Sequence, residues 1–211
     1  MKKVAVSIHA IDDFDPNIIR NLKGLDFIHV DVMDGKFVNN TNNNLDVFRL
    51  LKDKYDIPII AHLMVNNPKV YIDKIIEFID YFIFHFESEG DKEDLIKRVH
   101  NYNKSVGIAI NPDTEVLKII PFLNSIDIIL VMSVNPGWSG QKFIPKMIDK
   151  VNNLAKYKKK YNFEIDIDGG VNLVHAKVLI NADILSSASA ILKSVDPNFV
   201  IQQLKKSDEK E

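Results

Sequence analysis

The sequence contains no cysteine and a single tryptophan among its 211 residues. Without thiols the chain has no disulfide scaffold, no thiolate metal site, no iron–sulfur cluster and no cysteine nucleophile. An excess of one charge is also lacking, because 27 lysines and arginines oppose 29 aspartates and glutamates, for a formal net charge of −2. Proteins dedicated to nucleic acids usually carry a basic excess, so we expect no nucleic-acid partner.

Long hydrophobic runs are absent as well. The sequence opens with Met1-Lys2-Lys3 and then has only three apolar residues before Ser7. That is too short for the core of a signal peptide, and no run approaches the roughly 18 residues of a membrane span. We therefore expect a cytoplasmic protein with no membrane partner.

The length and the hydrophobic content of 46% are those of one globular domain. We expect that domain to cover residues 1–204, and the polar tail at residues 205–211 to fray. The only biased segment inside the domain is the asparagine-rich stretch at residues 39–44.

Short apolar runs rich in β-branched residues alternate with segments of helical period along the chain. Eight runs can be counted, at residues 4–8, 27–32, 57–61, 81–84, 106–110, 126–132, 164–167 and 183–185. Runs that are apolar on both faces indicate a buried parallel sheet. Eight such units favour a closed (β/α)₈ barrel. The alternative, an open doubly wound sheet, lacks the G-x-G-x-x-G that would follow its first strand.

Several helix starts between the runs carry capping signals. Asp15-Pro16 predicts a helix that Gly24 closes, and Asp196-Pro197 predicts the last helix. Three further starts are predicted at Asn67-Pro68, at Asp113-Thr114 before residues 116–120, and at Phe143-Ile144-Pro145.

Polar residues close most of the runs. In a barrel the carboxyl ends of all strands meet at one mouth, where active sites are built, so these residues are predicted to converge. They are Ser7, His29 with Asp31, His62, His85, Asn111, Ser133 after Met132, Asp168, and the segment from Ser186 to Ser189.

The pair His29 and Asp31 lies at the end of the second run. Residues two apart on a strand share a face, so both point inward if the valines between and after them pack outward. The same parity sends His62 inward. With Asp168 these residues make a plausible divalent-metal site of nitrogen and oxygen ligands. The alternative is that each histidine is separately hydrogen-bonded or exposed.

Asp168-Gly169-Gly170 ends the seventh run, and its glycines would let the backbone turn sharply beside a ligand. The alternative is an ordinary strand-to-helix turn. Asp166 shares the inward parity of Asp168 and would need a partner that the sequence does not identify. Two other segments have similar alternatives: residues 134–141 form an anion-binding loop or a rigid turn, and residues 186–189 bind phosphate or cap a helix.

Three methionines, Met33, Met64 and Met132, share the inward parity near the mouth. They are cavity lining or core filler. The remaining histidines point less clearly to a function. His9, His100 and His175 have no setting that suggests a site, whereas His85, with Glu87 two residues on, either supports the site or is structural.

Taken together, the polar segments resemble the ribulose-phosphate 3-epimerase family over nearly the full chain, in the order and spacing of that family. The segments are His29-Val-Asp-Val-Met-Asp-Gly-Lys-Phe-Val38, His62-Leu-Met-Val65, Asn111-Pro112, Met132-Ser-Val-Asn-Pro-Gly137, Gly140-Gln-Lys-Phe143 and Asp168-Gly-Gly170.

The resemblance implies a (β/α)₈ barrel that interconverts D-ribulose 5-phosphate and D-xylulose 5-phosphate in the pentose phosphate pathway. It also implies a homo-oligomer and one divalent ion, commonly zinc or iron, although such ligands also accept manganese or cobalt. The residues that match ligands of the ion are His29, Asp31, His62 and Asp168. Asp31 and Asp168 match the acid/base pair. The positions that match contacts of the small sugar-phosphate substrate are Ser7, His62, Gly137, Trp138, Ser139, Gly140, Asp168, Gly169, Gly170, Ala188 and Ser189.

The chain departs from the family pattern at a few positions. Ala188 stands where glycine is usual, which is tolerable if its φ is negative. His9 replaces an apolar residue, and Trp138 a frequent phenylalanine. Three other activities stay open: epimerisation of a hexulose phosphate such as D-allulose 6-phosphate, a non-catalytic sugar-phosphate-binding barrel, and a metallohydrolase.

Overall fold

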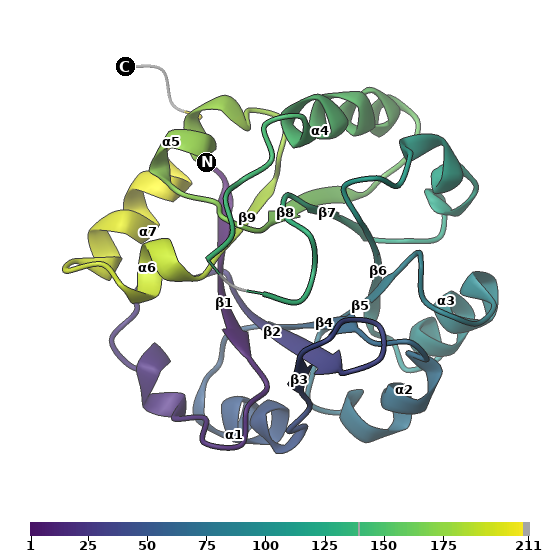
Figure 1. Ribbon diagram of the computed structural model, residues 1–211, viewed down its shortest axis with the longest axis horizontal. Coiled ribbons are helices and arrows are strands. Elements are labelled where there is room, and N and C mark those ends of the chain that lie inside the picture. The colour runs from purple at the N-terminus through teal and green to yellow at the C-terminus, as the bar shows by residue number, and fades with distance from the viewer. Residues whose placement is uncertain (139, 209–211) are drawn as a thin grey trace.

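The computed structural model describes residues 1–138 and 140–208, and within them one sheet closes into a barrel (Figure 1). Eight strands run parallel, and β1 pairs with both β2 and β9, which closes the ring. A short ninth strand, β3, runs antiparallel to β2. The strands are β1 (Lys3–His9), β2 (Phe27–Asp34), β3 (Thr41–Asn42), β4 (Ile59–Met64), β5 (Tyr81–His85), β6 (Ser105–Ile110), β7 (Ile128–Met132), β8 (Glu164–Asp168) and β9 (Ile184–Ser187). The predicted (β/α)₈ barrel is confirmed.

Helices surround the barrel on its outside (Figure 1). The α-helices are α1 (Asp46–Lys54), α2 (Lys69–Ile75), α3 (Lys92–His100), α4 (Met147–Ala155), α5 (Leu173–Val178), α6 (Ser189–Leu192) and α7 (Pro197–Lys205). Four short 3₁₀ segments add η1 (Pro16–Ile19), η2 (Val116–Lys118), η3 (Ile120–Phe122) and η4 (Lys156–Lys159). No helix in this part of the chain is long and apolar enough to cross a membrane.

The capping predictions are partly right. Asp196 caps α7 by accepting from the backbone N–H of Phe199, and Asp15 accepts from that of Asn17. The segment after Asp15, however, forms only the four residues of η1 and does not continue as a helix to Gly24. Residues 116–122 are also not α-helical. Pro121 has no N–H to donate to the preceding turn, and so the segment breaks into two 3₁₀ turns.

Side-chain parity divides the core into two layers. Val30 and Val32 of β2 pack outward in the large cluster beneath the helices. Phe27 of the same strand points inward with Ile60, Ile83 and seven other buried side chains of the barrel interior and its rim. These inward-pointing side chains fill the barrel towards the amino ends of the strands. A site can therefore form at inward positions closer to the carboxyl ends.

The asparagine-rich segment and residue 205, the first of the predicted C-terminal tail, have structure beyond what we predicted, while residues 209–211 of that tail lie outside the described residues. In β3, Asn42 pairs with Met33 and its Nδ2 donates to Nδ1 of His9 at 3.1 Å. This contact holds the segment against the barrel mouth. At the other end, Lys205 is still part of α7, and its ammonium donates to the carbonyl of Gly24 at 2.8 Å.

Candidate active site

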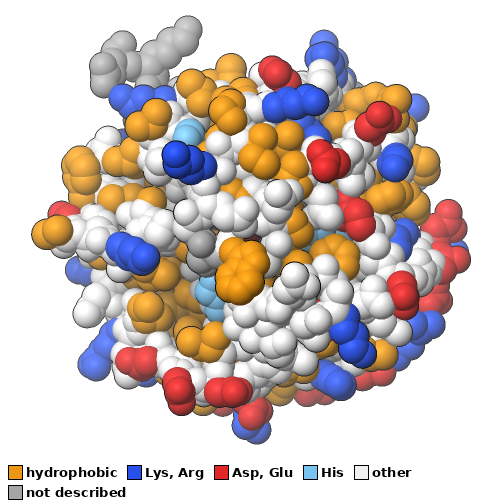
Figure 2. Space-filling model, viewed as in Figure 1, with side chains coloured by type: hydrophobic (Ala, Val, Ile, Leu, Met, Phe, Trp, Pro, Cys, Tyr) orange, Lys and Arg blue, Asp and Glu red, His pale blue; other side chains and the backbone are white. Residues whose placement is uncertain are grey.

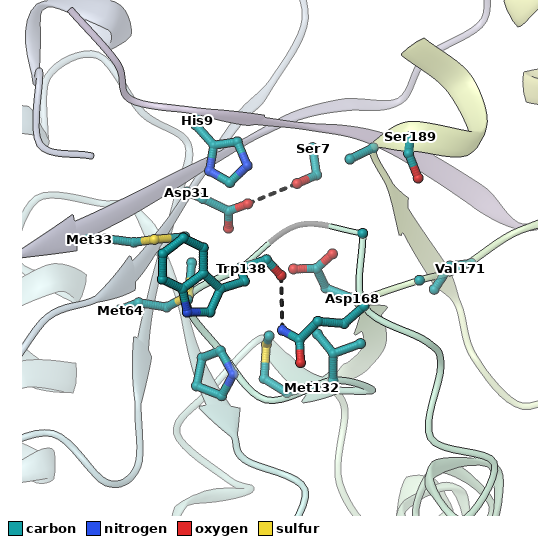
Figure 3. A pocket seen from close by; sticks show the side chains of 18 residues that line it. Ser7, His9, Asp31, Met33, Met64, Met132, Trp138, Asp168, Val171 and Ser189 are labelled. Carbon is teal, nitrogen blue, oxygen red and sulfur yellow. Dashed lines mark hydrogen bonds between the residues drawn. The ribbon is translucent and has the colours of Figure 1, made fainter. Parts of the chain in front are cut away.

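A cavity opens at the carboxyl ends of the strands, where the polar residues were predicted to meet (Figure 3). The loop that follows β7 runs across this end of the barrel (Figure 1). On the face seen in Figure 2, charged side chains lie mainly toward the rim, and the centre is covered mostly by uncharged and hydrophobic groups. The lining residues are Ser7, His9, Asp31, Met33, Met64, Met132, Val134, Pro136, Gly137, Trp138, Gly140, Gln141, Asp168, Gly169, Gly170, Val171, Ala188 and Ser189.

Four buried side chains converge at the floor of this cavity. Oδ1 of Asp31 lies 3.1 Å from Nε2 of His29 and 2.8 Å from Nδ1 of His62. Oδ2 of Asp168 lies 3.8 Å and 3.9 Å from the same two nitrogens. One potential ligand atom from each residue lies within 4.8 Å of all the others. The histidines therefore act as one cluster and not separately.

The donor set of this cluster fits a metal ion. Two imidazole nitrogens and two carboxylate oxygens are the ligands that zinc and similar divalent ions accept. The histidines are fully buried, and Asp31 and Asp168 are 5% and 8% exposed, so the charges of the two acids must be balanced locally. The cluster could hold one divalent cation.

The pKa values of His29 and Asp31 also indicate that the cluster favours a positive charge beside its carboxylates. Burial lowers the pKa of His29, but Asp31, Asp168 and Asp166 outweigh that effect and raise it to about 9. Burial likewise opposes ionisation of Asp31, yet the charge and hydrogen bonds of the two histidines hold its pKa well below the usual range. A proton on His29 thus occupies the place that a cation would take, since ligation requires an unprotonated ring nitrogen.

The second acid of the cavity behaves differently. Burial, and then the negative charge of Asp31, raise the pKa of Asp168 to about 6. Burial also lowers the pKa of His62, although its contacts with Asp31 oppose the shift. The two aspartates therefore differ in proton affinity, although they share one cluster.

A serine fixes the other oxygen of Asp31. Oγ of Ser7, at inward parity on β1, donates to Oδ2 of Asp31 at 2.9 Å (Figure 3). Because the histidines contact Oδ1, both carboxylate oxygens of Asp31 are held in place.

Asp166 has its partner on the neighbouring strand. Oγ of Ser186 lies 3.0 Å from each carboxylate oxygen of Asp166 and 3.1 Å from Nδ1 of His29. Asp166 is fully buried, and burial raises its pKa to about 6. The residue lies below the cavity, as its parity predicted, and orients His29 through Ser186.

His85 contacts the cluster through His62. Its Nε2 lies 2.9 Å from Nε2 of His62, and its Nδ1 lies 3.3 Å from Oε2 of Glu87. Phe37 packs against the His85 ring with centroids 4.8 Å apart.

The glycines around the cavity are needed by the backbone. Gly169 has a φ of +115°, and a Cβ there would lie 2.5 Å from Cγ2 of Val134. Gly137 has a φ of +112°, and its Cβ would lie 3.0 Å from Cβ of Val38. Both turns thus bring the chain closer to its neighbours than any other residue allows.

The loop after β7 places Trp138 at the mouth, where the residue is 62% exposed. Nε2 of Gln141 donates to the carbonyl of Trp138 at 2.9 Å (Figure 3). It also donates to the carbonyl of Asn135 at 2.6 Å. Ser139, predicted as a substrate contact, lies outside the described residues.

At the end of β9, Ala188 has a φ of −102°, so the alanine fits where glycine is usual in the family. Ser189 begins the four-residue helix α6. Both residues line the cavity together with Met33, Met64 and Met132, which are each 2% exposed.

Two lining residues, His9 and Val171, were not predicted. We gave His9 no setting that suggests a site, but it lines the cavity beside Asp31 (Figure 3). The signal was present in the sequence, because His9 follows Ser7 by two residues on the same strand and shares its face.

Comparison with known proteins extends this picture to nearly the whole chain. Residues 3–192 match the sequence model of the ribulose-phosphate 3 epimerase family. The chain is 35% identical to ribulose-phosphate 3-epimerase of Schizosaccharomyces pombe, over 97% of this chain and 93% of that protein. It is 33% identical to the Bacillus subtilis protein of the same name, over 98% and 100%. Among solved structures, 3-hexulose-6-phosphate synthase of Salmonella typhimurium superposes with a TM-score of 0.72 at 15% identity, over 99% of this chain and 98% of that one, and so shares the fold.

Proposed function

This chain belongs to the ribulose-phosphate 3-epimerase family, and from that premise we propose that it interconverts D-ribulose 5-phosphate and D-xylulose 5-phosphate by inverting C3. The chain is accordingly an isomerase. What the proposal adds is the assignment of each step to particular side chains.

The observation that carries the proposal is the placement of two acids in one cavity. Asp31 comes from β2 and Asp168 from β8, and β1 and β9 separate these strands in the ring. Inversion beside a ketone requires a base on one face of the carbon and an acid on the other. In our proposal one aspartate removes the C3 proton to give a planar enediolate. The other aspartate then donates a proton to the opposite face, and the roles exchange in the reverse direction.

The different proton affinities of the two acids support this division. The pKa of Asp31 is held well below its usual range, so that carboxylate is ionised and can accept a proton. The pKa of Asp168 is raised to about 6 by burial and by Asp31, so it holds a proton more readily. Pairs of titratable groups whose environments separate their pKa values are typical of acid/base sites.

The residues proposed to hold the ion are His29, Asp31, His62 and Asp168. When bound, a divalent ion would stabilise the negative charge that develops on the substrate oxygens, which is worth several kcal/mol. Ser7 holds Asp31 in place for proton transfer. Met33, Met64 and Met132 give the cavity apolar walls that exclude water from the planar intermediate.

For the phosphate we propose the backbone N–H groups of the turns at residues 137–138, 140, 169–170 and 188–189. What supports this assignment is that these residues line the same cavity as the acids. It also matches the general tendency of barrel enzymes to bind phosphate at the loops after the last two strands.

The decisive experiment follows the C3 proton. In D₂O, the ion-loaded protein should convert D-ribulose 5-phosphate to D-xylulose 5-phosphate with deuterium incorporated at C3, as seen by ¹H NMR. A non-catalytic sugar-phosphate-binding barrel would bind the sugar without exchange, and that result would contradict the proposal. Removal of the ion with a chelator should abolish exchange, and zinc, iron, manganese and cobalt added back in turn identify the effective metal.

A hexulose phosphate is the second candidate substrate. His9, with Asn42 bonded to it, adds polar groups to the wall of the cavity beside Asp31, and such groups suit an additional hydroxyl. Values of kcat/KM for D-ribulose 5-phosphate and D-allulose 6-phosphate decide between them, and we expect the pentulose to be preferred. The cytoplasmic location and the homo-oligomer expected from the sequence belong to the same proposal, and cell fractionation and light scattering test them.

A further inference from the structure

A chain of hydrogen bonds leads from the ion cluster to a carboxylate on the far side of His62. His62 on β4 uses Nδ1 toward Asp31, and its other nitrogen, Nε2, lies 2.9 Å from Nε2 of His85 on β5. Nδ1 of His85 then lies 3.3 Å from Oε2 of Glu87. Both histidines are fully buried and stack with centroids 5.1 Å apart, so water does not compete for the contact between them.

Glu87 is itself anchored at its other oxygen. Oε1 accepts from the backbone N–H of Asn111 at 2.9 Å and from the hydroxyl of Thr114. Burial alone would raise the pKa of Glu87, but the hydrogen bonds from His85, Thr114 and Asn111 lower it to about 2. The side chain is therefore a carboxylate, which accepts hydrogen bonds and donates none.

The positions of the protons along these hydrogen bonds follow from the Glu87 carboxylate. Because Glu87 only accepts, Nδ1 of His85 carries the proton in that contact. With one proton on its ring, His85 then accepts at Nε2 from Nε2 of His62. An ion bound through Nδ1 of His62 would need a lone pair on that nitrogen, and this arrangement supplies it. Without an ion, the same nitrogen lies 2.8 Å from the Asp31 carboxylate and shares a proton with it.

We propose that Glu87 and His85 are positioning residues that hold His62 in the tautomer able to bind the ion through Nδ1. This inference rests on the ion site proposed above. His29 has an equivalent arrangement, in which its Nδ1 contacts Ser186 and Ser186 donates to Asp166. Each imidazole of the cluster is thus linked to a separate acid, and groups of this kind tune ligand orientation and affinity.

The test is the affinity of the chain for zinc, measured by competition with a chromophoric chelator, in the wild type and in Glu87→Gln. The amide oxygen of the variant would keep the donors of Asn111 and Thr114, which places its NH₂ group toward His85. His85 would then be protonated at Nε2 and could no longer accept from His62. We expect zinc binding to weaken about 10- to 100-fold, and Glu87→Asp, which keeps a carboxylate, to recover part of the loss.

Lys150→Met is the matched control. The Lys150 ammonium donates to the carbonyls of Asn111, Pro112 and Thr114 and so holds the same loop as Glu87 without contacting either histidine. Its loss should lower thermal stability and leave zinc affinity within twofold of the wild type. An equal loss of affinity in both variants would show that loop packing is responsible, and the inference would be wrong.

A spectroscopic measurement separates positioning from stability. In the zinc-loaded wild type, the Nε2 proton of His62 should give a downfield, slowly exchanging ¹H–¹⁵N signal, and in Glu87→Gln that signal should move upfield or disappear. If Asp31→Asn loses zinc but Glu87→Gln keeps both affinity and signal, this inference alone falls. If the wild type binds no zinc, iron, manganese or cobalt, the proposed ion site falls and this inference falls with it.

Discussion

Oγ of Ser186 lies 3.0 Å from each carboxylate oxygen of Asp166, in a contact that is completely buried beneath the candidate active site. A hydroxyl has one proton, so it donates to the acid and accepts from Nδ1 of His29. The serine thus joins a ligand of the ion cluster to an acid that has no direct contact with the cavity.

Ser186→Ala should therefore destabilise the protein by about 1–3 kcal/mol at neutral pH, because it leaves a buried carboxyl group without its side-chain donor. Urea unfolding measures the effect. Ser187→Ala is the control, since Oγ of Ser187 makes a single buried bond to the carbonyl of Val171 at 2.9 Å. That neutral bond should be worth about 0.5–1.5 kcal/mol. A loss in Ser186→Ala no larger than the loss in Ser187→Ala would argue against a role in holding Asp166.

The two acids of the cavity lead to the most direct kinetic prediction. Asp31→Asn and Asp168→Asn should each lower kcat by at least about 10²- to 10⁴-fold, the usual contribution of a positioned acid or base. Circular dichroism should be unchanged, because asparagine has almost the same shape. Asp53→Asn, at an exposed position on α1, provides the control. Retention of more than a tenth of the wild-type kcat by either cavity variant would rule out the two-acid assignment.

The barrel and the inward direction of its site residues could be predicted because both depend on local pattern. Eight apolar runs suffice for the ring, and the two-residue spacing of His29 and Asp31 decides which face they share. The partner of Asp166 was not predicted, because it depends on which strands lie side by side in the barrel. Ser186 reaches Asp166 because β9 lies beside β8, and no local rule gives the partner of a buried acid.

Other features were missed for identifiable physical reasons. His9 follows the same parity as Ser7 but was assigned no site, although β3 brings Asn42 against it. The pairing of β3 with β2 cannot be read from an asparagine-rich stretch with low strand propensity. The helix expected at residues 116–120 did not form because the effect of Pro121 on the preceding turn outweighed the capping signal.

Acid should destabilise the ion-free protein through Glu87. In the folded chain, hydrogen bonds to the Glu87 carboxylate outweigh the effect of its burial. They lower its pKa to about 2, below the ordinary value of 4.5. The unfolded chain binds a proton first, and the stabilisation is therefore complete above about pH 5 and is lost as the pH falls toward 2. Because the side chain is partly exposed, the loss should be on the order of 2 kcal/mol.

Unfolding by urea between pH 6 and pH 3 measures this loss. Glu87→Gln has no such titration, so the difference in stability between the wild type and the variant should shrink as the pH falls. A difference that is constant across this range would show that the Glu87 carboxylate does not have the lowered pKa.

The turn after Asp168 should tolerate no side chain at Gly169. Its φ of +115° strains any other residue, and a Cβ would lie 2.5 Å from Cγ2 and 3.0 Å from the backbone nitrogen of Val134. The backbone conformation alone should cost about 1–3 kcal/mol in Gly169→Ala. Relief of the contact must also move Val134 or Asp168, both close to the site of proton transfer, and a shift of about 1 Å there can lower kcat roughly 10²-fold.

Gly140→Ala distinguishes this effect from the general cost of a positive φ. Gly140 has a φ of +80°, but nothing described lies within 4 Å of its Cβ position, so the substitution should cost only about 1–2 kcal/mol. Urea unfolding and kcat, measured for both variants, should show a large loss of activity in Gly169→Ala alone. Equal effects on kcat would mean that the two turns contribute alike. The close approach of Gly169 to Val134 would then not be what keeps Asp168 in position.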